Sequence, residues 1–66
     1  MVMKNFAAKL KELRIQYNLS QQEVADNLGL TRSAYSNYEQ GTREPSLEIF
    51  QKICQFYEIN ADYFWE

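Results

Sequence analysis

Helix-breaking residues are confined to three positions in this chain of 66 residues. Gly29, Gly41 and Pro45 are its only glycines and its only proline. Between them, apolar side chains recur every three or four residues, which is the period of an amphipathic helix. No segment alternates apolar and polar residues as a half-buried strand would. The chain is therefore expected to be all-α, with short helices joined by short connections.

Polar residues that cap helix N-termini divide the chain further. A first helix is expected over about residues 4–17, where apolar side chains recur at spacings of four, three and four. Ser20 and Glu23 form a capping-box pattern, in which each side chain accepts the other residue's backbone N–H. Four more short helices are expected, one ending at Gly29 and three over about residues 32–40, 47–57 and 61–65; their caps are Ser20, Thr31, Ser46 and Asn60.

The length and composition exclude several classes of protein. Residues 1–66 suffice for a single domain and leave no room for a second core. A single cysteine excludes an internal disulfide framework, and without histidine a structural zinc site lacks its ligands. Histidine is also the commonest general base, and no apolar run approaches the roughly 20 residues of a membrane span. We therefore expect a soluble, cytoplasmic protein that is not an enzyme and requires no metal, cofactor or membrane.

The net charge of −2 hides a strong asymmetry along the chain. Residues 1–20 carry four basic side chains and one acid, whereas residues 44–66 carry one lysine and five acids. A polyanion could therefore bind the N-terminal two thirds of the protein while the acidic end faces away.

The third predicted helix has an unusual outer face. On a helical wheel one side is apolar or aromatic, and the other carries five polar side chains and no acid: Arg32, Ser33, Ser36, Asn37 and Gln40. Such side chains can hydrogen-bond to base edges, arginine to guanine and asparagine to adenine. The alternative is a neutral face that is simply solvated. Only about two residues, Gly29 and Leu30, separate this helix from the one before it, which is the spacing of a helix-turn-helix.

Three segments carry a family resemblance: Ser20-Gln-Gln-Glu-Val-Ala-Asp-Asn-Leu-Gly29, Thr31-Arg-Ser-Ala-Tyr-Ser-Asn-Tyr-Glu-Gln-Gly41 and Pro45-Ser-Leu. Together they resemble the Cro and phage-repressor type of helix-turn-helix, the XRE family, from about Leu10 to Trp65. The resemblance implies a compact five-helix, lambda-repressor-like domain with its helix-turn-helix over about residues 20–40. It also implies a bacterial or phage-encoded transcriptional regulator, acting as a repressor, that reads double-stranded DNA through the major groove.

The same resemblance implies roles for individual residues. Those expected to read bases are Arg32, Ser33, Ser36 and Asn37. Those expected to contact DNA phosphates are Gln21, Thr31, Gln40, Thr42 and Arg43. Gln21 would also brace the first base-reading residue. The alternatives are that Gln21 is an ordinary surface residue and that Arg43 only pairs with Glu44.

The resemblance also concerns one buried ion pair, and the chain departs from the family in two respects. Arg14 and Glu39 match a pair that some members bury as a structural salt bridge, so Arg14 is not expected to contact DNA. The chain departs from the family in its net acidity and in three tyrosines, Tyr35, Tyr38 and Tyr57, whose hydroxyls each need solvent or a partner. Tyr38 either reaches a phosphate or packs inside.

The C-terminal region, residues 47–66, is expected to form a two-fold homodimer that binds an operator with two symmetric half-sites. On the wheel of the fourth helix, one arc supplies the core: Leu47, Phe50, Ile53, Cys54 and Tyr57. Further apolar side chains lie beyond what one small core needs, so the expected dimer interface consists of Ile49, Phe56, Tyr63 and Trp65. The alternative is that Trp65 merely folds over the core.

Two questions stay open at the level of sequence. The same fold could serve as a protein-binding module, either an antitoxin or an anti-repressor, although the acid-free face of the third helix favours DNA. The chain could also be the DNA-binding piece of a longer repressor. We favour a stand-alone protein.

Overall fold

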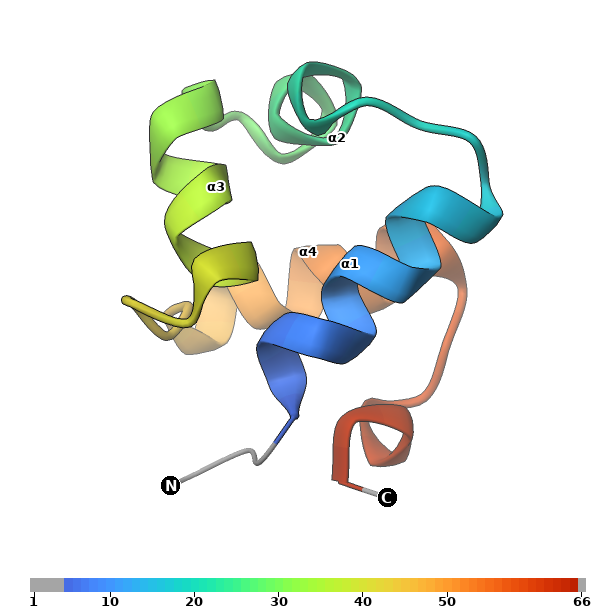
Figure 1. The fold of residues 1–66 in the computed structure, drawn as a ribbon. Coiled ribbons are helices and arrows are strands. Elements are labelled where there is room, and N and C mark those ends of the chain that lie inside the picture. Colours follow the sequence, from blue (N-terminus) through green and yellow to red (C-terminus); the bar gives the residue numbers. More distant parts are fainter. Residues whose placement is uncertain (1–4, 66) are drawn as a thin grey trace.

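The computed structural model describes residues 5–65, and its regular secondary structure is entirely helical. Figure 1 shows the elements in chain order, and no strand occurs among the described residues. The α-helices are α1 (Phe6–Gln16), α2 (Gln21–Leu28), α3 (Arg32–Gln40) and α4 (Leu47–Tyr57), followed by a short 3-10 helix, η1 (Ala61–Trp65).

The caps lie where the sequence predicts them. The Ser20 hydroxyl accepts the Glu23 N–H at 3.0 Å and the Glu23 carboxylate accepts the Ser20 N–H at 2.9 Å, which completes the capping box. The Thr31 and Ser46 hydroxyls cap α3 and α4 by accepting the N–H of Ala34 and of Ile49, without the reciprocal bond. α2 and α3 both end in a glycine with positive φ, 72° and 79°, a conformation in which a side chain would be strained.

Two predicted helices differ from the structure. The α1 helix begins at Phe6 after a left-handed Asn5 and ends at Gln16, and residue 4 of the predicted range lies outside the described residues. The predicted fifth helix is a 3-10 helix, so four α-helices replace the expected five. Five residues leave little room for bonds four residues apart, and the Tyr63 N–H instead donates to the Asn60 carbonyl at 3.0 Å.

Side chains from all five elements meet in one core. Within residues 5–65, ten residues are buried: Phe6, Leu10, Leu13, Val24, Ala25, Leu28, Tyr35, Ile53, Tyr57 and Phe64. The prediction that Leu47 belongs to the core is wrong, because this residue opens α4 and its side chain remains 69% exposed. Of the other predicted α4 core residues, Ile53 and Tyr57 are buried, while Phe50 and Cys54 are half-buried against the cluster.

The three tyrosines find different environments. Tyr35 is fully buried and its hydroxyl donates to the Glu39 carboxylate, while half-buried Tyr38 packs against the core. The prediction fails for Tyr57, which is 2% exposed and whose hydroxyl makes no hydrogen bond of normal geometry among the described residues, although the neighbouring Tyr35 side chain interacts with it. Burial, together with the negative charge of Glu39, raises the pKa of Tyr57 to about 12.

Replacing Tyr57 by phenylalanine should stabilise the protein. The substitution removes a buried hydroxyl without a well-formed hydrogen bond and keeps the ring, so we expect a gain of about 1 kcal/mol, or about 4–8 °C in Tm for a domain of this size. Thermal unfolding followed by circular dichroism measures the change. The matched variant Tyr35→Phe should be destabilised, because it removes a donor to Glu39. A loss of stability in Tyr57→Phe would show that its hydroxyl has a partner.

Candidate functional site

A tight turn sets α2 and α3 against each other. The Leu30 N–H donates to the Ala25 carbonyl at 2.9 Å and so closes the turn at Gly29. Ala25 is fully buried between the helices, where its small side chain lets them approach. The two helices cross steeply in Figure 1. This arrangement leaves the outer side of α3 exposed and is that of a helix-turn-helix.

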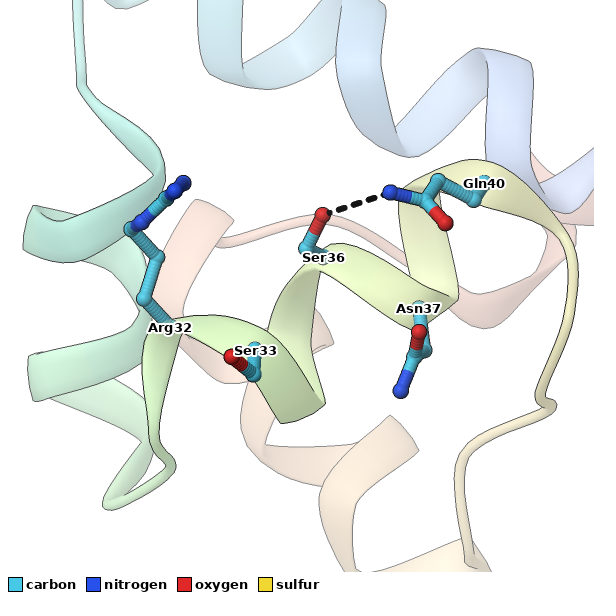
Figure 2. A pocket seen from close by; sticks show the side chains of 5 residues that line it. All are labelled: Arg32, Ser33, Ser36, Asn37 and Gln40. Atoms are coloured by element: carbon cyan, nitrogen blue, oxygen red, sulfur yellow. Dashed lines mark hydrogen bonds between the residues drawn. The ribbon is translucent and has the colours of Figure 1, made fainter.

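Five side chains of α3 line a shallow, open hollow of about 280 Å³ on that outer side: Arg32, Ser33, Ser36, Asn37 and Gln40. Figure 2 shows them along one face of the helix, with the Gln40 amide donating to the Ser36 hydroxyl at 3.1 Å. They comprise the four predicted base-reading residues and one predicted phosphate contact. No acidic side chain lines the hollow, and each of the five side chains carries a hydrogen-bond donor. The surface therefore offers many donors to an anionic partner.

The N-termini of α2 and α3 lie next to this face. Each has unpaired backbone N–H groups and a partial positive charge, which favour a bound phosphate or other anion. Gln21 is the first residue of α2, and Thr31 caps α3. Both of these predicted phosphate contacts therefore stand at helix ends suited to an anion.

Gln21 lies beside Arg32 in the structure. Arg32 Nη1 donates to Gln21 Oε1 at 3.2 Å, which is the bracing contact that the resemblance implied. The other end of the same amide is also bonded, since Gln21 Nε2 donates to Glu39 Oε1 at 3.2 Å. Gln21 is thus more than an ordinary surface residue.

Arg14 and Glu39 form an ion pair beneath the outer face of α3. Arg14 Nε lies 2.7 Å from Glu39 Oε2, and the two side chains are only 14% and 3% exposed. Arg14 Nη1 also donates to the Leu19 carbonyl at 2.9 Å, so Arg14 points inward and not toward a ligand. The hydrogen bond to Glu39 raises the pKa of Arg14.

The Glu39 carboxylate is the centre of this network. Its two oxygens accept hydrogen bonds from Arg14, Tyr35 and Gln21. Burial by itself favours the neutral acid, but these three donors outweigh burial and lower the pKa of Glu39. Burial, together with the hydrogen bond to Glu39, raises the pKa of Tyr35. Glu39 is therefore ionised, and its buried charge is neutralised by Arg14.

The loop after α3 folds back onto Asn37. The backbone N–H groups of Thr42 and Arg43 both donate to the Asn37 carbonyl, at 3.1 and 3.4 Å. The Thr42 hydroxyl lies 3.2 Å from the same carbonyl and 3.3 Å from Asn37 Oδ1. Arg43 is exposed, and among the described residues it forms no ion pair with Glu44. The side chain of Arg43 thus remains available to a ligand.

The predicted dimer surface is only partly exposed. Ile49, Phe56 and Tyr63 are half-buried against the core, whereas Trp65 is 43% exposed. Lys9 Nζ donates to the Tyr63 carbonyl at 2.8 Å and lies 5.2 Å from the centre of the Tyr63 ring.

A second shallow hollow of about 320 Å³ lies between α2 and α4, lined by Asn27, Lys52, Gln55 and Phe56.

The sequence did not predict the hydrogen bond between Gln21 and Glu39 or the contacts of Thr42 with Asn37. Eighteen positions separate Gln21 from Glu39, and no sequence pattern pairs them.

Within residues 5–65, no group of three or more acidic, cysteine or histidine side chains could hold a metal ion. None of the helices in that range is long and apolar enough to cross a membrane.

The chain resembles known proteins over most of its length. A helix-turn-helix family model matches residues 10–64. The cryptic phage CTXphi transcriptional repressor RstR of Vibrio cholerae is 39% identical over 54 residues, which cover 82% of this chain and 49% of that protein. The uncharacterized HTH-type transcriptional regulator YqaE of Bacillus subtilis is 43% identical over 58 residues, with coverage of 88% and 50%.

A third relative is close to this chain in length. The uncharacterized HTH-type transcriptional regulator YgzD of Bacillus subtilis is 38% identical over 64 residues, which cover 96% of this chain and 92% of that protein. The chain therefore spans about half the length of the first two relatives and nearly all of the third.

Proposed function

Because the chain belongs to this helix-turn-helix family, we propose that it binds double-stranded DNA sequence-specifically and acts as a transcriptional repressor in the cytoplasm. The observation that carries the proposal is the acid-free outer face of α3, flanked by two helix N-termini. The similar phage protein of Vibrio cholerae is itself named a transcriptional repressor.

In this proposal α3 enters the major groove with its N-terminal end toward the bases. Arg32 donates two hydrogen bonds to a guanine, and Asn37 bonds to an adenine. Ser33 and Ser36 reach neighbouring base edges. The DNA backbone is held by phosphate contacts that fix the register of the protein but carry no direct sequence information; these come from Gln21, Thr31, Gln40, Thr42 and Arg43.

Selection of binding sites from a pool of random duplexes tests this function. The expected result is enrichment of one sequence with two symmetric half-sites. If no duplex is enriched above the starting pool, DNA is not the partner, and the protein-binding alternative, an antitoxin or anti-repressor, replaces the proposal.

Replacing Arg32 by alanine should weaken binding to the selected duplex and relax the preference for guanine at one position. A bidentate contact between arginine and guanine contributes about 1–3 kcal/mol of discrimination. Gel-shift titration of the selected duplex and of variants with that guanine exchanged measures the effect. An equal loss of affinity for every duplex would identify Arg32 as a phosphate contact instead.

The proposed functional unit is a homodimer assembled through residues 47–66. The exposed Trp65 ring supports the proposal, since large exposed aromatic side chains often mark interfaces. A dimer also places two copies of α3 about 34 Å apart, one turn of DNA, so that both half-sites are read from the same side of the duplex.

A further inference from the structure

Glu39 lies one hydrogen bond away from the recognition surface without being part of it. Its side chain is 3% exposed, so it is too deep to touch a ligand on the outer face of α3. Through Gln21, however, its carboxylate is linked to Arg32, the residue proposed to read guanine. The network thus runs from a buried charge to an exposed recognition side chain.

The polarity of the two neighbours fixes the direction of the Gln21 amide. An ionised carboxylate only accepts hydrogen bonds, and a guanidinium only donates them. The amide NH2 must therefore face Glu39 and the amide oxygen must face Arg32, as found. A reversed amide would set oxygen against oxygen at Glu39 and donor against donor at Arg32. No other orientation satisfies both contacts.

All acceptor positions of Glu39 are used in this arrangement. Oε1 accepts from Arg14 and Gln21, and Oε2 accepts from Arg14 and Tyr35. Four hydrogen bonds match the roughly four lone-pair directions of a carboxylate. The carboxylate is held rigidly from below, and a rigid acceptor can orient the side chain above it.

We propose that Glu39 is a positioning residue for base recognition, which sets the Gln21 amide so that its oxygen receives the Arg32 guanidinium. The role rests on the proposed function, since it concerns how Arg32 meets a guanine. Arginine has many rotamers in solution, and an anchored guanidinium loses less freedom when it binds. A buried residue thereby contributes to sequence preference through two hydrogen bonds.

The substitution Glu39→Gln tests the relay because it changes polarity and keeps shape. The new amide oxygen is drawn to the position where Arg14 Nε and the Tyr35 hydroxyl both donate. Its NH2 group then faces Gln21, whose amide must turn and present a donor to Arg32. The contact with Arg32 is lost, although no group that touches DNA has been replaced.

The measurement is the ratio of affinities for the selected duplex and for the same duplex with the Arg32-contacted guanine exchanged. Glu39→Gln should reduce this ratio about three- to tenfold, which corresponds to the usual interaction energy between neighbouring residues. In a Gln21→Ala background, the same substitution should leave the ratio unchanged. An unchanged ratio in the native background, or an equal reduction in both backgrounds, would overturn the proposal.

Two variants separate the relay from a loss of structure. Asp26→Asn makes the same acid-to-amide change on the exposed side of α2, where the Asp26 carboxylate accepts a hydrogen bond from Gln22, and should leave the ratio unchanged. If Glu39→Gln alone does not fold, Arg14→Met combined with Glu39→Gln removes both buried charges and leaves the same donor facing Gln21. A general loss of stability would lower all affinities alike and would not change the ratio.

A second readout needs no DNA. The side-chain NH2 signals of Gln21 in the NMR spectrum of the free protein should shift in Glu39→Gln and not in Asp26→Asn. Unchanged signals would overturn the proposal even if the protein binds DNA. If the protein selects no duplex, the proposed function fails and the role in base recognition fails with it, while these signals still show whether Glu39 orients the amide.

Discussion

Replacing Arg14 by alanine should lower the free energy of unfolding by about 3–5 kcal/mol, because it leaves the Glu39 carboxylate buried without its counter-charge. A core of this size supplies only about 3–5 kcal/mol of net stability. Most molecules of the variant should therefore be unfolded in buffer. Urea titration followed by circular dichroism measures the loss.

The exposed arginine of the loop is the control for this prediction. Arg43→Ala removes the same charge from a site without an ion pair among the described residues, and should change stability by less than about 0.5 kcal/mol. An equally small loss in Arg14→Ala would show that the buried pair contributes little to stability.

Acid should reduce the difference between the native protein and Arg14→Ala. The pKa of Glu39 in the folded protein is lowered from its ordinary value of 4.5. The ionised carboxylate therefore contributes its full stabilisation above pH 4.5, and this contribution is lost as the pH falls through the lower pKa of the folded protein. Below the pKa of the folded protein the carboxyl is neutral and no longer needs Arg14 as a counter-charge. A difference that stays constant from about pH 7 to about pH 3 would contradict this origin of the loss.

Replacing Phe56 by glutamate together with Trp65 by serine should give a monomer whose affinity for the operator is reduced about 100-fold or more. A dimer that holds two half-sites gains at least this factor from the second, intramolecular binding step. Sedimentation equilibrium measures the assembly, and gel-shift titration measures the affinity. The affinity for a duplex with a single half-site should be nearly unchanged.

Two further variants control for folding and for general surface change. Phe56 is half-buried and its ring lies 4.9 Å from that of Tyr57, so circular dichroism must show that the double variant is folded. Trp65→Ser alone is the gentler change, since Trp65 is 43% exposed. Ile15→Ser removes an exposed apolar side chain from α1 and should leave the dimer intact. A native protein that sediments as a monomer and binds one half-site as tightly as two would refute the dimer.

The sequence alone determined the features that depend on neighbouring residues. A helix cap bonds to a backbone group three residues away, so Ser20, Thr31 and Ser46 could be placed without any knowledge of the tertiary structure. The outer face of α3 followed from the helical period in the same way, and its five polar side chains line one hollow. The ion pair of Arg14 and Glu39 was implied by family resemblance and not by any local pattern.

Only the tertiary structure decided what depends on the packing of one helix against another. The wheel of α4 placed Leu47 in the core, but a wheel cannot show how far along the helix the neighbouring elements extend. The burial of the Tyr57 hydroxyl and the bond from Gln21 to Glu39 likewise depend on residues that lie far apart in the chain. The Gln21 bond spans 18 positions and exists because α2 and α3 cross at the Gly29 turn, which brings the start of one helix to the end of the other.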